Sequence, residues 1–534
     1  MTQFKYLALA AQEITQGVAP ESIPSKPPQK TTPPVLFGHT PPPVSGNGFF
    51  AHVKEFVSNA APLLNRASTE GPVTVIYLMG KPIVVISDPT LIEHLQTQGK
   101  VGTEIEHTPP NAYVYVHGHW SPYTLNNAEL HRALSAAVTK SATMSGKHAP
   151  TLQLAKVSLQ ALEGKPIQLS EAVSDFAARS FVSNFMGIQN TDTTALSNAF
   201  RNLADATKKD LPLHLLTRIA FRARQARRVW NQEIRNMLDK GIKQHPDGTA
   251  WPLLDAIAPL RYKQLHPNDQ RSDAELITAY RNKGDVYKAL HANQDFLSFF
   301  SSLMFAGHET TLNGIGFLVS HFQHDLDADW KAELIAEMTE NQDAPNYLGR
   351  TDTRLHQFVT EMLRKDPLVP ISLRRLAEDA ILTAQDGQPF HLAKGSTCIL
   401  NMMSYAHNTS VFGSSAAAFS PTPGTQAEDK LPPSFGKGSF ACKGTKLAET
   451  NLKAFLMALV LGYQLEGLDI PTSKEPKVVG LNIGPTITGT LTPKGSELPT
   501  PTPATPPTPG LAKRLVTATI GGLGRLARWA AGRT

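Results

Sequence analysis

The sequence contains only two cysteines, Cys398 and Cys442, among its 534 residues. Two thiols cannot form a disulfide framework or a four-thiolate zinc site, so each is interpreted alone, and a reducing compartment is the natural expectation. Long apolar runs are also absent. No stretch reaches the length that spans a bilayer, and the run 6–11 is too short for the core of a signal peptide. These absences argue against a disulfide-rich secreted domain and a multi-span membrane protein, and they predict a cytoplasmic location.

Most of the chain lacks an excess of either charge. The formal net charge is +6, and five cationic residues lie in a tail without Asp or Glu: Lys513, Arg514, Arg525, Arg528 and Arg533. The rest of the chain is therefore nearly neutral and lacks the basic face that nucleic-acid binding requires, so we expect no nucleic-acid partner. The contents of 41% hydrophobic and 18% charged residues are typical of a folded protein.

Proline divides the chain into four parts. A proline-rich leader covers 1–47, and a second tract, in which proline alternates with threonine, covers 498–510. Proline fixes φ and removes an amide donor, so these tracts are expected to be extended connections outside the core. We therefore expect one folded unit at 48–497 and a separate basic amphipathic tail at 511–534.

The folded unit is predicted to be mainly α-helical with a small β region. Apolar residues recur at intervals of three and four, which is the helical period, at 152–162, 296–322 and 447–461. Short runs of β-branched residues at 73–78 and 83–86 flank a turn and predict a hairpin. A second group of strands is expected after Arg374, at 381–382 and 397–400.

The segment 434–444 places glycines around one cysteine, just before an apolar helix. Its notable residues are Phe435, Gly436, Gly438, Cys442 and Gly444. Glycine allows positive φ and a close approach to a bulky flat group, and a thiolate at a helix start is favoured by the helix dipole. Taken alone, the segment also fits a glycine-rich turn with an ordinary buried cysteine.

A second segment lies inside the long apolar stretch 296–322. The small residues Ala306 and Gly307 precede Glu309 and Thr310. Glycine inside a helix costs about 1 kcal/mol relative to alanine, which suggests that the small residues open a groove. The Thr hydroxyl can bind a ligand there and the carboxylate can pass protons inward, although a self-satisfied Thr and a solvent-facing Glu also fit.

A third pair, Glu361 and Arg364, stands three residues apart on one helical face. Such pairs are usually solvated and contribute a few tenths of a kcal/mol. The order and spacing of the three segments set this pair apart from an ordinary surface pair, because Glu361 lies 51 residues after Thr310 and 81 residues before Cys442.

With these three segments in this order, the chain resembles the cytochrome P450 family of haem-thiolate monooxygenases. The resemblance implies a triangular, mainly helical fold around haem b, with the iron bound by Cys442 in a loop formed by Phe435, Gly436 and Gly444. A thiolate ligand favours O–O cleavage. It also implies that Thr310 hydrogen-bonds dioxygen beside Ala306 and Gly307, and that Glu309 joins proton delivery.

Other residues are assigned by the same resemblance. Arg374 and Arg132 would pair with the haem propionates, because a guanidinium matches a carboxylate. Glu361 and Arg364 would be structural.

The chain departs from the family at two positions. Phe440 stands where the family usually has Arg or His, and Lys437 or His131 are candidates to replace that propionate partner. The sequence Phe419-Ser420-Pro421 is followed by Thr422, although the family usually places there an Arg that completes the Glu-x-x-Arg network.

The predicted function is insertion of one oxygen atom of O₂ into an apolar organic molecule. Only 92 residues follow Cys442, too few for a fused reductase, so electrons would come from a separate ferredoxin or flavoprotein reductase. Two alternatives are an isomerase, dehydratase or peroxygenase that needs no reductase, and a degenerate haem-binding protein without turnover.

Three further segments bear on substrate and location. The aromatic stretch 111–123 either lines the substrate pocket or packs in the core. The arginines at 218–235 either meet an acidic partner or a membrane or form a solvated helix face. The tail 511–534 either lies on an anionic membrane as a basic amphipathic helix or is disordered in water.

Overall fold

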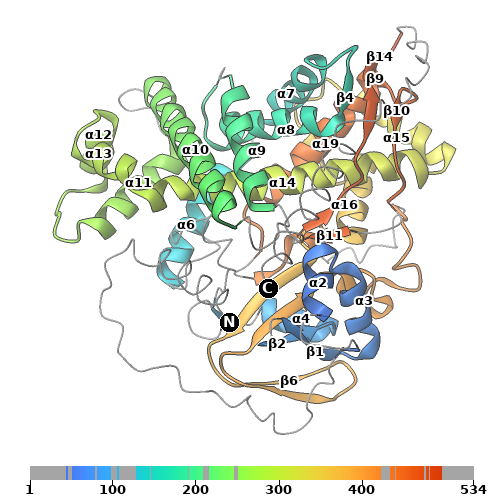
Figure 1. Cartoon of the computed structure of the whole chain (residues 1–534). Coiled ribbons are helices and arrows are strands. Elements are labelled where there is room, and N and C mark those ends of the chain that lie inside the picture. Colours follow the sequence, from blue (N-terminus) through green and yellow to red (C-terminus); the bar gives the residue numbers. More distant parts are fainter. Residues whose placement is uncertain are drawn as a thin grey trace, which may run out of the picture.

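We analysed a computed structural model of the chain. It describes residues 44–45, 51–78, 81–97, 105–106, 128–144, 146–189, 192–208, 216–245, 251–421, 433–438, 441–473, 477–479 and 481–495. The leader, linker and tail predictions at 1–43 and 498–534 and the aromatic stretch 111–123 lie outside these ranges. Helices dominate the described part and the strands form small sheets (Figure 1), so the predicted fold class is confirmed.

The longest helix is α14 (Gln294–His324), which crosses the middle of the molecule (Figure 1). Asn293 caps it, because its side chain accepts a hydrogen bond from the Phe296 amide. Apolar residues surround most of the helix, and it packs against α8 (Leu169–Ser180), α16 (Arg354–Lys365) and α19 (Thr445–Gly462). The predicted apolar helices around 296–322 and 447–461 are therefore confirmed as core elements.

The other helices surround this centre. They are α2 (Ala51–Ser58), α3 (Ala61–Glu70), α4 (Pro89–Thr97), α6 (Ala128–Ser141), α7 (His148–Gln160), α9 (Thr194–Lys208), α10 (Leu216–Gln244), α11 (Pro252–Leu265), α12 (Asp273–Arg281), α13 (Asp285–Ala292), α15 (Ala328–Glu340), α17 (Met402–Ala406) and α18 (Thr409–Phe412). One π-helical turn, η1 (Phe181–Phe185), continues α8, and two short 3₁₀ helices are η3 (Tyr347–Gly349) and η4 (Pro433–Phe435).

The largest sheet has the strand order β1-β2-β8-β5-β3. The hairpin β1 (Val73–Leu78) and β2 (Lys81–Ile86) pairs Val75 with Val84, as predicted. Strand β8 (Thr397–Asn401) runs parallel to β2 and antiparallel to β5 (Ile371–Leu376), which pairs with β3 (Ile105–Glu106). The sequence prediction began the second strand group after Arg374, but β5 already contains that residue. The adjacent charged residues Arg374 and Arg375 interrupt the apolar pattern from which a strand is predicted.

Four smaller sheets make up the rest of the β region in the part of the chain that the structure describes. They contain β6 (Ala380–Thr383) with β7 (Pro389–Leu392), β11 (Lys477–Val479) with β12 (Leu481–Ile483), β14 (Thr492–Pro493) with β9 (Tyr463–Gln464), and β10 (Leu468–Asp469) with β13 (Thr488–Thr490) and β4 (Pro166–Gln168). None of the described helices combines the length and the apolar character needed to cross a bilayer.

Candidate active site

The cysteine loop is held by backbone contacts at both ends. The Cys442 amide donates to the Phe435 carbonyl at 2.8 Å, which closes the loop, and Gly436 and Gly438 have φ of 61° and 64°. These are left-handed conformations that favour glycine. At Gly438 a Cβ atom would lie 2.3 Å from the Gln96 carbonyl oxygen, so the loop lies directly against the end of α4.

Two polar contacts attach the same loop to its neighbours. Lys437 Nζ lies 2.8 Å from Glu93 Oε1, and Tyr405 also donates to that oxygen. Ser434 Oγ donates to the Leu363 carbonyl of α16 at 2.7 Å. The structure therefore places Lys437 in an ion pair with α4, where it positions the loop.

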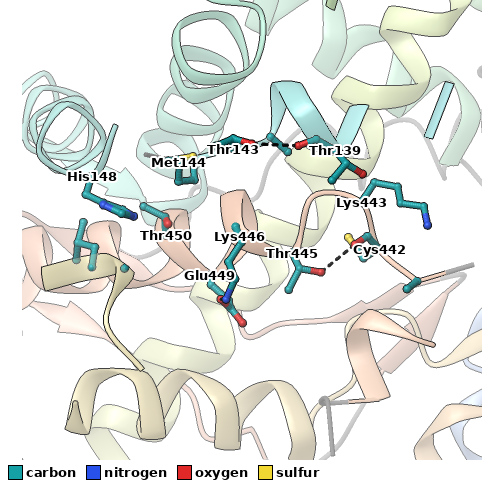
Figure 2. A pocket seen from close by; sticks show the side chains of 14 residues that line it. Thr139, Thr143, Met144, His148, Cys442, Lys443, Thr445, Lys446, Glu449 and Thr450 are labelled. Atoms are coloured by element: carbon teal, nitrogen blue, oxygen red, sulfur yellow. Dashed lines mark hydrogen bonds and ion pairs between the residues drawn. The ribbon is translucent and has the colours of Figure 1, made fainter. Parts of the chain in front are cut away.

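Cys442 lies beside a hollow of about 540 Å³ whose lining comes from α6, the turn that follows it, the start of α7, η3, the loop itself and α19 (Figure 2). The thiol is exposed at the surface of this hollow. Many protein atoms nevertheless surround it, and this burial raises the pKa of the Cys442 thiol, although the Gly444 amide and the Thr445 hydroxyl lower it in part. Cys398, by contrast, is fully buried in β8, as expected for a small apolar residue.

Between its exposed ends, α14 is buried except at 305–307, Thr310 and Leu312. Phe305, Ala306 and Thr310 are partly exposed and Gly307 is exposed, and a Cβ atom on Gly307 would meet nothing within 4 Å. An open space therefore lies beside this turn of an otherwise buried helix. The alternative of a solvent-facing acid is wrong, since Glu309 is only 4% exposed. Thr310 Oγ1 donates to the Ala306 carbonyl at 2.6 Å, the local hydrogen bond that a helical Thr often makes.

The proposed propionate partners differ in their surroundings. Arg374 is buried, and its Nη1 donates to Ser372 Oγ at 2.9 Å and to the Leu373 carbonyl at 2.8 Å. Burial lowers the pKa of Arg374 to about 10. His131 is buried on α6, where burial and then the charge of Lys443 lower its pKa, whereas Arg132 beside it is exposed.

Glu361 and Arg364 form a buried hub, so the alternative of a solvated pair is wrong. Each of the five N–H groups of Arg364 has an acceptor. Two go to Glu361, with Nε to Oε2 at 2.7 Å and Nη2 to Oε1 at 2.8 Å. The other three go to carbonyl oxygens of Ala406, Ala416 and Ala418 at 2.7–2.9 Å.

The Glu361–Arg364 hub also binds the segment 419–421, after which the family usually has an Arg. Glu361 Oε1 also accepts from the Ser420 amide at 2.8 Å. Thr422 and Phe440, the two departures from the family pattern, lie outside the described residues.

His321 forms a second anchor for this segment. Its ring lies between Asp325 Oδ2 at 2.7 Å and Asp366 Oδ2 at 2.5 Å, and it stacks on Phe419 with centroids 4.2 Å apart. Burial lowers the pKa of His321, but its bonds to Asp325 and Asp366 raise it by more, so the net shift is upward. The His321 imidazole thus joins the end of α14, Asp366 just after α16 and the chain at 419.

This anchor predicts a pH-dependent stability. A raised folded pKa means that the contribution of His321 is complete below its unfolded pKa of about 6.5 and is lost as pH rises through the folded value. His321→Gln should therefore destabilise the protein by about 3 kcal/mol at low pH and by less at high pH, because it leaves Asp366 buried without its partner. Denaturant unfolding at several pH values measures this effect. His324→Gln, which removes a bond to the Ile470 carbonyl, is the control; equal pH slopes in both variants would contradict the assignment.

A second prediction concerns the cysteine loop. Gly438→Ala should destabilise the loop by about 1–3 kcal/mol from φ strain, plus the clash with Gln96, and should reduce haem retention. Gly387→Ala is the matched control, because its φ is 86° but a Cβ would meet nothing within 4 Å. Equal losses in thermal stability and haem content for the two variants would show that the contact with α4 has no role.

Comparison with known proteins now identifies the family. A family model described as Cytochrome P450 matches residues 38–488. The chain belongs to the cytochrome P450 family. Among curated proteins, Cytochrome P450 4F8 of Homo sapiens is 23% identical over 195 residues and Cytochrome P450 4F1 of Rattus norvegicus is 25% identical over 198 residues. Each match covers 35% of this chain and 36% of the relative, so the aligned part spans about a third of those proteins.

Solved cytochrome P450 structures share the fold. The retinoic acid-bound cyanobacterial CYP120A1 superposes with a TM-score of 0.64 at 18% identity, covering 85% of this chain and 99% of that chain. The heme domain of cytochrome P450DA gives 0.63 at 15% identity, with 85% and 98% covered. Family membership and fold are therefore as the sequence predicted, while the role of each residue stays a prediction.

The described residues of this cytochrome P450 fit a haem. Cys442 offers a thiol at an exposed position, Gly444 keeps the space beside its sulfur free of a Cβ atom, and Gly307 leaves room beside α14. Sequence reasoning missed Lys437 as a loop anchor and His321 altogether. Glu93 lies 344 residues from Lys437 and Asp366 lies 45 residues from His321, and no local pattern signals these two pairs, although the spacing of His321 and Asp325 by four residues is a local signal.

Proposed function

We propose that this cytochrome P450 is a monooxygenase that inserts one oxygen atom of O₂ into an apolar organic substrate. The observation that carries the proposal is the open turn of α14, where a buried Glu309 precedes Thr310 beside the exposed Gly307. An acid and a hydroxyl at one accessible point can deliver protons to reacting oxygen. The family's haem b, when bound, supplies the redox chemistry that activates O₂.

Cys442 would hold the iron of that haem through its thiolate. The loop fixes the sulfur through the bond from the Cys442 amide to Phe435, and the positive-φ turns at Gly436 and Gly438 bring the chain against α4. Gly444 and Thr445 stabilise negative charge on the sulfur, since both lower the pKa of the thiol against the effect of burial.

Thr310 and Glu309 would handle protons. The Thr310 hydroxyl donates to the Ala306 carbonyl, and in the reaction it would turn from that carbonyl toward the open space. The buried Glu309 carboxylate would then supply the proton that leaves with water. Proton delivery by a positioned side chain typically contributes about 10²–10⁴-fold to a rate.

The propionates would be bound by Arg374 and by His131 or Arg132. Desolvation of Arg374 lowers its pKa to about 10, so a bound carboxylate would restore a favourable partner for its charge. Because Arg132 is exposed and His131 is buried, His131 is the better placed of the two on α6.

Electrons would come from a separate ferredoxin or flavoprotein reductase. Of the basic helix residues, Arg227 donates to Ser298 and Arg235 donates to the His291 carbonyl, so these two contribute to packing. A cytoplasmic protein with peripheral membrane contact through 511–534 is also proposed. Co-sedimentation with anionic liposomes, with and without those residues, tests that contact; equal binding would refute it.

The test of the proposed function is turnover of the holoenzyme with a surrogate ferredoxin and reductase against a panel of apolar compounds. Monooxygenation predicts an oxygenated product that requires reductant and carries label from ¹⁸O₂. Product formed without reductant would instead support isomerase, dehydratase or peroxygenase chemistry. Bound haem without any product would support a degenerate haem-binding protein.

A further inference from the structure

A row of buried polar side chains leads away from Glu309 across two neighbouring helices. His308 Nδ1 lies 3.5 Å from Glu309 Oε1, and His308 Nε2 lies 2.8 Å from Ser174 Oγ on α8. Ser174 Oγ in turn lies 3.3 Å from Ser197 Oγ on α9. Four groups from three helices thus lie in one row, in which the two steps through Ser174 are hydrogen bonds and the step from His308 to Glu309 is a close approach without one.

Apolar surroundings isolate this path. His308, Ser174 and Ser197 are each less than 5% exposed, and the Phe200 ring lies against the imidazole with centroids 4.7 Å apart. At its outer end, Ser197 has the exposed residues Thr194 and Asn198 as neighbours on α9. The path therefore begins near the surface and ends at the acid of the open α14 turn.

The imidazole is hydrogen-bonded at one nitrogen and has an acid close to the other. Ser174 satisfies Nε2, while Nδ1 has no hydrogen-bond partner among the described residues and its nearest acid is Glu309. Small movements of Glu309 would bring its carboxylate into hydrogen-bond contact with the ring.

We propose that His308 is a proton-relay residue that reprotonates Glu309 from solvent through Ser174 and Ser197. This inference rests on the proposed function and extends it. His308 does not touch the reacting oxygen; it acts through Glu309. A neutral imidazole suits the task, because one ring nitrogen donates while the other accepts.

The proton balance closes with one proton taken from water. Once Glu309 has given up its proton, Nδ1–H passes a proton to Oε1, and Nε2 accepts the proton of the Ser174 hydroxyl. Ser174 recovers a proton from Ser197, and Ser197 recovers one from water at the surface. The ring ends as the Nε2–H tautomer, and the starting state returns when Nδ1 takes a proton from water on the side of the open α14 turn and Nε2 releases its proton outward through Ser174 and Ser197.

The first test examines the path by NMR in the absence of turnover. In ¹⁵N-histidine-labelled holoenzyme, held diamagnetic as the reduced carbon-monoxide complex, His308 should be neutral and protonated at Nδ1. Ser174→Ala and Glu309→Ala should each shift its ring signals. Unchanged ring signals in both variants would overturn the proposal.

The second test uses turnover. His308→Gln keeps hydrogen-bonding groups but cannot relay a proton, so product formation should fall about 10-fold or more, with haem content unchanged. Ser174→Ala should act in the same direction, and both should enlarge the solvent deuterium isotope effect. Ser320→Ala, which removes another buried hydroxyl of α14 that donates to the Pro471 carbonyl, is the control and should be neutral.

A double-mutant cycle distinguishes a proton-relay role of His308 from a purely structural role. Because His308 acts through Glu309, adding His308→Gln to Glu309→Ala should cost no further activity. Additive losses, or a normal isotope effect in His308→Gln, would assign the histidine to packing alone. Wild-type protein that forms no product would refute the proposed function, and the NMR arm would still decide whether the path exists.

Discussion

Replacement of Arg364 by leucine is expected to abolish folding of the catalytic unit. The change removes five hydrogen bonds at once and leaves the Glu361 carboxylate, which is 1% exposed, buried without its partner. Breaking a buried ion pair costs about 3–5 kcal/mol, and typical proteins have only about 5–15 kcal/mol of stability. The carbonyl groups of Ala406, Ala416 and Ala418 would lose their donor as well. Yield of folded protein and the thermal unfolding midpoint measure the effect.

A matched control lies on the same helix. Arg354 makes an ion pair with Glu333 near the surface, so Arg354→Leu should change stability by less than about 1 kcal/mol. Arg364→Lys should fail almost as badly as leucine, because an ammonium has three donors in the wrong geometry. A well-folded Arg364→Leu protein with normal haem content would contradict the scaffold role.

Replacement of Thr310 by alanine is expected to separate oxygen consumption from product formation. The hydroxyl lies next to Gly307 and Glu309 at the open turn, so its loss removes the group that would guide protons to the reacting oxygen. The ratio of product to O₂ consumed should fall several-fold, with a matching rise in peroxide. Oxygen electrode traces with product and peroxide assays on the same samples give this ratio.

Two further variants make this result specific. Thr310→Ser keeps the hydroxyl and should retain most of the coupling. Thr311→Val changes the adjacent buried threonine, so it should leave the ratio unchanged if the protein folds. Normal coupling in Thr310→Ala would remove the residue from the proton path.

The sequence alone predicts the family, the main helices and the first hairpin, because these features are local. Each of the three motifs spans only a few residues of sequence. These motifs are the glycines around Cys442, the small residues before Glu309, and the pair Glu361 and Arg364. The spacing of apolar residues at three and four likewise predicts α14 and α19.

The contacts that hold the site together join residues far apart in the sequence, and no local residue pattern predicts them. The serine contact at His308 crosses 134 residues of sequence, and the ion pair of Lys437 crosses 344. Strand β5 was placed too late because two adjacent arginines interrupt its apolar character. The missing family Arg after Phe419 illustrates the same limit, since the groups that anchor this segment, His321 against Phe419 and Glu361 at the Ser420 amide, come from elsewhere in the fold.

The central claim is that the Cys442 sulfur binds the iron of a haem. The most direct measurement is the absorption difference between the reduced protein with and without carbon monoxide. Thiolate ligation predicts the band characteristic of haem-thiolate proteins in the wild type and its loss in Cys442→Ala, with Cys398→Ala as the unaffected control. A wild-type spectrum without that band, or a band that survives Cys442→Ala, would contradict the account.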